Sequence, residues 1–181
     1  MREIEIKARV RDEASLLAAL NTKGIVLQAP LQQRDQVFGL PNVPGSDENH
    51  NWLRIRTEND SKHIFTLKRS VTGQLDSIEH ETTVEDPAET RAIIDELGFM
   101  PYSDLTKVRQ KAKYGDLEIC FDKIAELGTF IEVEKMMDLE ADNETVTNEL
   151  WKFFNSLGID KKDEEFDGYD VMMEKLQKSQ N

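Results

Sequence analysis

Charged side chains recur at every second position in the first strand that the sequence predicts, residues 2–8. Glu3, Glu5 and Lys7 share one face, and Ile4 and Ile6 share the other, because successive side chains of a strand point to opposite faces. Carboxylates are ligands for Mg²⁺ or Mn²⁺, and an ammonium group can bind phosphate. For this strand alone, however, an antiparallel strand with a solvated outer face is the better interpretation.

Basic side chains show the same alternation on three later strands. Arg54 and Arg56 share a face of the strand expected from Trp52, and Lys68 lies on the strand expected over 63–69. The strand expected over 106–114 carries four bases at every second position, Lys107, Arg109, Lys111 and Lys113. Arginine forks match phosphate oxygens bidentately, and lysines add point charge. These faces therefore predict a polyphosphate site lined by Lys7, Arg54, Arg56, Lys68, Lys107, Arg109 and Lys111.

Acidic side chains recur far along the chain. Glu132 and Glu134 share a face of the strand expected over 129–136 and, with Glu3 and Glu5, supply the hard oxygen ligands that Mg²⁺ or Mn²⁺ prefers. A metal ion would explain why carboxylates are tolerated beside a polyanion. The alternative is that these acids and bases only form salt bridges across neighbouring strands, worth roughly 0.2–1 kcal/mol each. For any single pair this alternative is the better interpretation.

The elements that must position these residues are strands interleaved with helices. Amphipathic helices are predicted from Asp12 to about Lys23, from Asp86 to Leu97, from about Asn143 to Leu157 and from Tyr169 to about Gln177. Further strands are expected over 25–29, 33–40, 77–84 and 117–123. The helices need an apolar sheet surface to cover, so the charged faces would point into a lumen if the sheet closes into a barrel. The segment 41–51 is expected to be a loop, either a surface excursion or a lid.

Composition restricts the function classes. The chain has 181 residues, which predicts a single domain over 1–181. A net charge of −13 argues against a nucleic-acid-binding surface but not against a small phosphate ligand in a local basic cleft. There is no apolar run long enough for a membrane span and no signal-peptide pattern, so we expect a cytoplasmic protein with no membrane partner. The single cysteine, Cys120, is expected to be a small packed residue. A homodimer is compatible with the sequence, which leaves the oligomeric state open.

Five segments, in order, resemble the motifs of the CYTH superfamily, the triphosphate tunnel metalloenzymes. They are Glu3-Ile4-Glu5-Ile6-Lys7, Leu53-Arg54-Ile55-Arg56, Thr66-Leu67-Lys68, Lys107-Val108-Arg109, and Asp122 followed by Leu127-Gly128-Thr129-Phe130-Ile131-Glu132-Val133-Glu134. Gly168-Tyr169-Asp170, followed by a short amphipathic helix, is similar to the end of the class IV adenylyl cyclase branch.

The resemblance implies an α+β fold, an eight-stranded antiparallel β-barrel with flanking helices, whose tunnel binds a triphosphate and one or two divalent ions. By position it implies phosphate ligands at Arg54, Arg56, Lys68, Lys107 and Arg109, with Lys7 contributing, and metal ligands at Glu3, Glu5, Glu132 and Glu134. It assigns supporting roles to Glu79, Glu81 and Asp122. Lys111 is added to the phosphate ligands because it lies on the same strand face as Lys107 and Arg109. The predicted catalytic residues are Glu3, Glu5, Lys7, Lys107 and Arg109.

Three activities fit this prediction. The first, favoured by the segments similar to the cyclase branch, is conversion of ATP to cyclic AMP and pyrophosphate. The second is a triphosphatase that hydrolyses inorganic tripolyphosphate, thiamine triphosphate or a nucleoside triphosphate. The third is a polyphosphate or nucleotide binder without catalysis.

Overall fold

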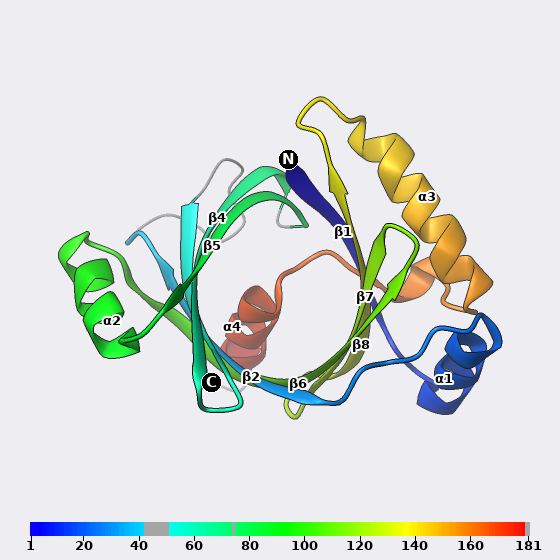
Figure 1. Cartoon of the computed structure of the whole chain (residues 1–181), viewed down its shortest axis with the longest axis horizontal. Coiled ribbons are helices and arrows are strands. Elements are labelled where there is room, and N and C mark those ends of the chain that lie inside the picture. Colours follow the sequence, from blue (N-terminus) through cyan, green and yellow to red (C-terminus); the bar gives the residue numbers. More distant parts are fainter. Residues whose placement is uncertain (42–50, 74, 180–181) are drawn as a thin grey trace. The chain divides into compact units, whose positions relative to one another are not determined.

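The computed structural model describes residues 1–41, 51–73 and 75–179, which divide into two compact units (Figure 1). The first unit comprises Met1–Pro30 and Val108–Phe166, and the second comprises Leu31–Lys107 and the residues from Asp167 onward. Strand β6 (Met100–Tyr114) runs from the second unit into the first. Apart from its two end residues, the loop expected over 41–51 lies outside the described residues.

The first unit is an antiparallel sheet with two α-helices. Its strands follow the order β6-β7-β8-β1-β9. The elements other than β6 are β1 (Arg2–Arg9), α1 (Glu13–Thr22), β7 (Leu117–Ile124), β8 (Gly128–Met137), α3 (Asn143–Ser156), the 3-10 helix η1 (Lys161–Asp163) and β9 (Glu164–Glu165). Helix α1 begins where the Asp12 side chain accepts a hydrogen bond from the Ser15 amide at 3.0 Å, which satisfies one of the free N–H groups of the first turn.

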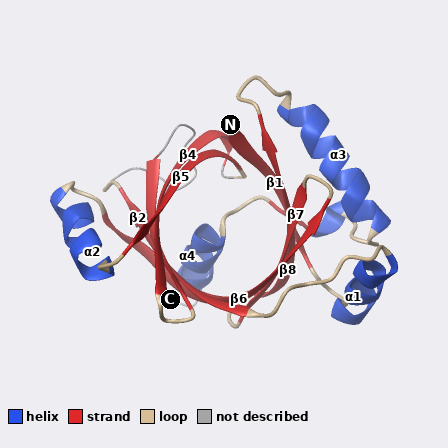
Figure 2. Ribbon diagram, viewed as in Figure 1, coloured by secondary structure: helices blue, strands red, loops and turns tan. Residues whose placement is uncertain are grey.

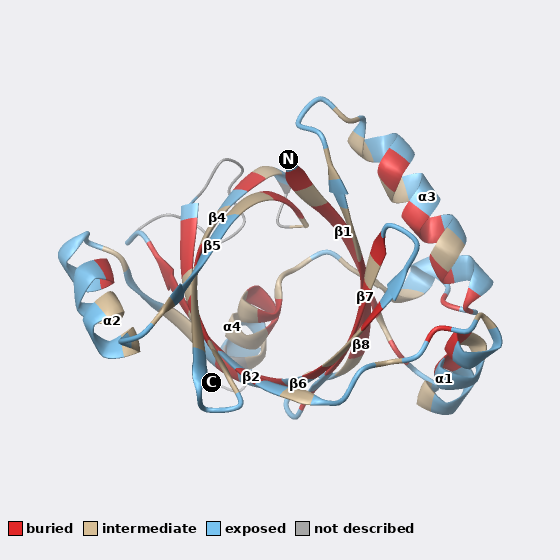
Figure 3. Ribbon diagram, viewed as in Figure 1, coloured by how far each residue is buried: buried red, intermediate tan, exposed pale blue. Residues whose placement is uncertain are grey.

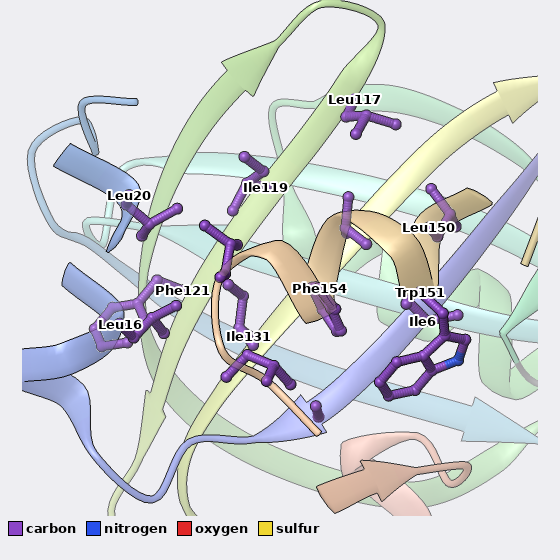
Figure 4. Close-up of a cluster of buried hydrophobic side chains, with 14 of the residues drawn as sticks. Ile6, Leu16, Leu20, Leu117, Ile119, Phe121, Ile131, Leu150, Trp151 and Phe154 are labelled. Carbon is purple, nitrogen blue, oxygen red and sulfur yellow. The ribbon is translucent and has the colours of Figure 1, made fainter. Parts of the chain in front are cut away.

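The apolar faces of β1, β7 and β8 pack against both helices of this unit (Figure 4). Ile6, Ile119 and Ile131 from the strands meet Leu16 of α1 and Phe154 of α3 in one buried cluster. Figure 3 shows the buried positions of α3 on a single stripe, as expected for a helix with one apolar face. The helices therefore occupy the apolar face of the sheet and leave the charged face of β1 uncovered by them.

The second unit is also an antiparallel sheet, with strands in the order β5-β4-β3-β2-β6 (Figure 2). The remaining elements are β2 (Leu31–Gly39), β3 (Asn51–Glu58), β4 (Lys62–Gly73), β5 (Asp76–Val84), α2 (Pro87–Glu96) and α4 (Tyr169–Ser179). The hairpin between β3 and β4 turns at Asn59 and Asp60, whose φ angles of 46° and 55° these two residue types tolerate better than most.

Helix α2 covers the apolar face of the second sheet. Ile94 packs against Phe38, Leu53 and Ile55 in a buried cluster. Asp86 caps the helix, accepting hydrogen bonds from the amides of residues 88 and 89 at 2.9 Å. Asp35 of β2 and Arg54 and Arg56 of β3 alternate with these apolar side chains, so they lie on the opposite face of this sheet.

Two sequence-based expectations were wrong or incomplete. Residues 25–29 form no strand: the Ile25 amide instead donates to Leu20 O at the end of α1, and Gln28 makes one backbone hydrogen bond, to Lys111 O. Strand β6 begins at Met100 rather than at Thr106, and η1 and β9 were not predicted. Within the described residues, no helix is long and apolar enough to cross a membrane.

Truncation of the core of the first unit should lower the stability of the protein. Phe154 is fully buried, so Phe154→Ala should cost about 3–5 kcal/mol of unfolding free energy, measured by urea denaturation. Phe166→Ala is the control, because that ring is 70% exposed and its loss should change stability by no more than about 0.5 kcal/mol. Equal effects of the two substitutions would contradict the assignment of this core.

Candidate active site

Three carboxylates meet in the first unit. The antiparallel pairing of β1 with β8 places Glu5 opposite Glu134, and one carboxylate oxygen each of Glu3, Glu5 and Glu134 lie within 4.8 Å of one another. Such a group of oxygen atoms fits the preference of Mg²⁺ and Mn²⁺ for hard ligands. We call Glu3, Glu5 and Glu134 the carboxylate triad.

The electrostatics of the triad agree with this fit. Burial raises the pKa of the Glu134 carboxyl to about 7; the Arg109 guanidinium opposes the shift, whereas Glu5 and Glu132 add to it. Buried carboxylates that crowd together disfavour the charged form. A divalent cation bound by these oxygens would offset their mutual repulsion. The three carboxylates are therefore better suited to bind a metal ion together than to lie together without one.

Two buried bases lie beside the triad. The Lys7 ammonium, whose residue is 2% exposed, is 3.3 Å from Glu132 Oε1 and 3.6 Å from Glu5 Oε1. Arg109 donates from Nε to Asp122 Oδ1 at 2.7 Å and also bonds Glu132, and its Nη1 is 3.8 Å from Glu134 Oε1. Glu132 therefore contacts bases and is not one of the three close carboxylates.

A pocket of about 220 Å³ adjoins the triad within the first unit. Glu3 and Glu134 line it together with Glu118 and Lys113. Lys111 bonds Glu118, so this predicted phosphate ligand lies beside an acid at the edge of the pocket. The pocket gives two triad carboxylates a surface that a small molecule or ion can reach.

In the second unit, Asp35 joins two of the predicted phosphate ligands. Arg56 donates from Nε and Nη2 to the two Asp35 oxygens at 2.6 and 2.7 Å, and Lys107 Nζ is 3.8 Å from Asp35 Oδ2. All three side chains are buried. Burial alone would raise the pKa of Asp35, but Arg56, Lys107 and Arg54 together hold it well below its usual range. The Lys107 ammonium also lies 4.9 Å from the centre of the Tyr169 ring of α4.

A second charged group in this unit spans β3, β4 and β5. Lys68 Nζ is 2.9 Å from Glu79 Oε1, and Arg54 Nη2 is 3.7 Å from Glu79 Oε2 and 3.1 Å from Glu81 Oε1. Burial raises the pKa of Glu79, but Lys68 and Arg54 outweigh it and lower that pKa to about 2. Glu79 and Glu81, two of the three predicted supporting acids, therefore contact predicted phosphate ligands.

Within each unit, the structure brings together the residues that the sequence assigned to the site. The first unit brings together Glu3, Glu5, Lys7, Arg109, Asp122, Glu132 and Glu134, with Lys111 close by. The second unit brings together Arg54, Arg56, Lys68, Glu79, Glu81 and Lys107. The sequence analysis did not identify Asp35. Its only indication in the sequence was that it lies on the same face of a predicted strand as Gln33 and Val37. Tyr169, predicted only as the first residue of an amphipathic helix and as part of the Gly168-Tyr169-Asp170 segment, is buried and also contacts Lys107.

Comparison with known proteins matches this chain to one family. The family model of the CYTH domain matches residues 1–169. A protein of Methanocaldococcus jannaschii named as a candidate adenylate cyclase, MJ0240, is 29% identical over 167 residues, covering 89% of this chain and 92% of that protein.

Solved structures show the same fold at lower identity. The PH1012 protein of Pyrococcus horikoshii has a TM-score of 0.79 at 23% identity and covers 93% of this chain and 98% of its own. HpAC1 from Hippeastrum, described as an adenylyl cyclase candidate with a dominant triphosphatase activity, has a TM-score of 0.59 at 19% identity and covers 93% and 91%. The predicted fold class, an α+β eight-stranded antiparallel β-barrel with flanking helices, is confirmed by the structural match.

Removing carboxylates of the triad should weaken metal binding. Glu5→Gln and Glu134→Gln each remove a charged oxygen ligand, and each should lower the affinity for Mn²⁺ by more than about tenfold, measured by isothermal titration calorimetry. Glu144→Gln, at an exposed position on α3, is the control and should leave the affinity unchanged. Binding that survives both triad substitutions would place the metal elsewhere.

The Glu79 contacts predict an acid-dependent contribution to stability. The pKa of Glu79 in the folded protein, about 2, is below the ordinary glutamate value of 4.5. The contribution is therefore present above about pH 4.5 and is lost as the pH falls toward 2. Glu79→Gln should reduce the fall in unfolding free energy between pH 5 and pH 3, measured by urea denaturation at each pH. The same fall in both proteins would show that Glu79 is not held ionised by its neighbours.

Proposed function

Because the chain belongs to the CYTH family, we propose that it is a divalent-metal-dependent enzyme that acts on a triphosphate substrate. The observation that carries the proposal is the carboxylate triad, three acids gathered within 4.8 Å beside the buried bases Lys7 and Arg109. Acids that served only to neutralise bases would not need to crowd together. The proposed ion is Mg²⁺ or Mn²⁺.

The proposal gives each group of residues a task. Glu3, Glu5 and Glu134 would hold the metal, with Glu132 as a further candidate ligand. The ion, when bound, supplies positive charge to phosphate oxygens as negative charge develops on them. The side chains that bind and orient phosphate oxygens are Lys7, Arg109 and Lys111 of the first unit and Arg54, Arg56, Lys68 and Lys107 of the second. Asp122, Glu79 and Glu81 hold these bases in place.

For the reaction, we favour a class IV adenylyl cyclase type of chemistry. The 3′-hydroxyl oxygen of ATP attacks the α-phosphorus and loses its proton to water, and the bond from that phosphorus to the β-phosphate bridging oxygen breaks. Pyrophosphate leaves, and cyclic AMP is the other product. The name of the Methanocaldococcus relative and the Gly168-Tyr169-Asp170 segment support this choice. Buried Lys7 and Arg109 suit the stabilisation of charge on the phosphates, because preorganised donors act strongly where water is excluded.

The second candidate is a triphosphatase, in which water attacks the terminal phosphorus and the bond from that phosphorus to its bridging oxygen breaks. The diphosphate part of the substrate leaves, and orthophosphate and a proton are the other products. The Hippeastrum structure supports it, since that protein is described with a dominant triphosphatase activity. Inorganic tripolyphosphate, thiamine triphosphate and nucleoside triphosphates are the candidate substrates. Both reactions need the same acids and bases and differ in which phosphorus lies in line with the attacking oxygen.

Product analysis distinguishes the candidates. We expect the purified protein, incubated with ATP and Mg²⁺ or Mn²⁺, to yield cyclic AMP and pyrophosphate, detected by chromatography. Orthophosphate from ATP or tripolyphosphate would support the triphosphatase, and binding without product would support a non-catalytic binder. In either active case Glu5→Gln should lower the rate by about a hundredfold or more, because the triad loses a ligand.

Glu144→Gln is again the matched control and should keep the wild-type rate. Activity of Glu5→Gln equal to that of the control would contradict the role of the triad. A cytoplasmic location, a homodimer and the lack of a nucleic-acid or membrane partner stay predictions from the sequence.

A further inference from the structure

We propose that Asp35 is a positioning residue, which orients Arg56 and Lys107 so that they can bind phosphate oxygens. This inference rests on the proposed function, because it concerns how that function's phosphate ligands are held. Asp35 of β2 lies directly opposite Arg56 of β3 in the antiparallel register. Its two oxygens accept from Arg56 Nε and Nη2 at 2.6 and 2.7 Å, and Oδ2 also lies 3.8 Å from Lys107 Nζ.

Because Asp35 and the two bases are all buried, the position of the Asp35 carboxylate matters for both bases. Asp35, Arg56 and Lys107 are 5%, 8% and 3% exposed. Buried cations repel each other and lose their hydration unless an acid lies beside them. Asp35 lies beside both bases and offsets part of their charge, so its carboxylate influences where both cationic groups are held.

The geometry of the arginine allows both contacts. A guanidinium group has two edges that can bind an oxyanion, one formed by Nε and Nη2 and the other by Nη1 and Nη2. Asp35 uses the first edge, so its contact does not itself prevent a phosphate from binding at the second. With the first edge bonded, the plane of the guanidinium is fixed by two hydrogen bonds.

Lys107 is held from two directions within the same unit. Its ammonium lies 3.8 Å from Asp35 Oδ2 and 4.9 Å from the ring centre of Tyr169. A carboxylate and an aromatic face both attract a cation, so the flexible lysine stem loses freedom before any ligand arrives. Restricting a binding group in advance lowers the entropy cost of binding.

The first unit repeats this arrangement. Asp122 of β7 lies directly opposite Arg109 of β6, and it accepts from the same two nitrogen atoms, Nε and Nη2. Both aspartates and both arginines are buried. The contact between a buried arginine and an aspartate of the adjacent strand therefore recurs among the predicted phosphate ligands, although Arg109, unlike Arg56, is also bonded by Glu132.

An exposed pair provides the contrast. Arg34, the neighbour of Asp35 on β2, makes the same two-bond contact with Asp104, but these side chains are 56% and 46% exposed. Exposed ion pairs contribute little to stability, because water solvates both charges. The pair matches the chemistry of Arg56 and Asp35 without belonging to the predicted site, so Asp104→Asn is a matched control.

The competing explanation is that Asp35 occupies Arg56 in place of phosphate and must be displaced. The two explanations predict opposite results for Asp35→Asn. If Asp35 positions the bases, loss of its charge weakens binding of a polyphosphate. If Asp35 competes, the same substitution removes a rival anion and strengthens binding.

The experiment is isothermal titration calorimetry of the full chain with inorganic tripolyphosphate, in EDTA so that no metal-dependent turnover occurs. We expect Asp35→Asn to raise the dissociation constant about tenfold, as for the loss of charged hydrogen bonds, and Asp104→Asn to leave it unchanged. Unchanged or tighter binding by Asp35→Asn overturns the proposal.

A double-mutant cycle distinguishes positioning from a general structural effect. In an Arg56→Lys background the two-bond contact is absent, so Asp35→Asn should change the dissociation constant much less than it does in the wild type. An equal change in both backgrounds would show that Asp35 does not act through Arg56.

A second variant covers the case in which Asp35→Asn does not fold, judged by circular dichroism. Asp35→Glu keeps the charge, moves the carboxylate and should also weaken binding. Wild-type affinity in Asp35→Glu would then overturn the proposal. Failure of the wild type to bind any triphosphate, both in EDTA and with Mg²⁺ or Mn²⁺, would instead contradict the proposed function.

Discussion

The cost of burying charge is the constraint on which both units depend. Lys7 is almost completely buried in the middle of β1, and an ammonium group there is tolerated only beside Glu5 and Glu132. Arg56 and Arg109 meet the same condition through acids on adjacent strands. Each buried base therefore lies beside an acid at a particular place in the register, and in the first unit one of these acids, Glu5, also belongs to the carboxylate triad.

The helices create this constraint. The alternation of the strands gives each sheet one apolar and one charged face, and α1, α3 and α2 cover the apolar faces with the clusters around Phe154 and Ile94. Burial of the apolar face supplies the main stabilisation, at about 25 cal/mol per Å² of area removed from water. Because the apolar face anchors each strand, a shift of one residue would exchange the two faces. The same packing thus sets which charged side chains lie together.

The sequence predicted the faces but not the contacts across strands. Alternation alone placed Glu3, Glu5 and Lys7 on one face, and the cap at Asp86 located α2. The pairing of Glu5 with Glu134 joins residues far apart in the chain, and no local pattern specifies that register. Asp35 was missed for the same reason, since its role follows from the residue opposite it on β3. The strand expected over 25–29 failed because its first amide completes the end of α1.

The arrangement of charges in the carboxylate triad favours the proposed binding site over a structural salt-bridge network, the alternative that the sequence left open. Arg34 with Asp104 and Lys123 with Glu13 are simple pairs of opposite sign, which need no ligand. The triad differs, because three like charges converge within 4.8 Å and burial with neighbouring acids raises the pKa of Glu134. A network formed only for stability would gain by replacing one of these acids with a neutral residue. Crowded acids beside buried bases are instead the arrangement that a cation and a polyanion, bound together, would neutralise.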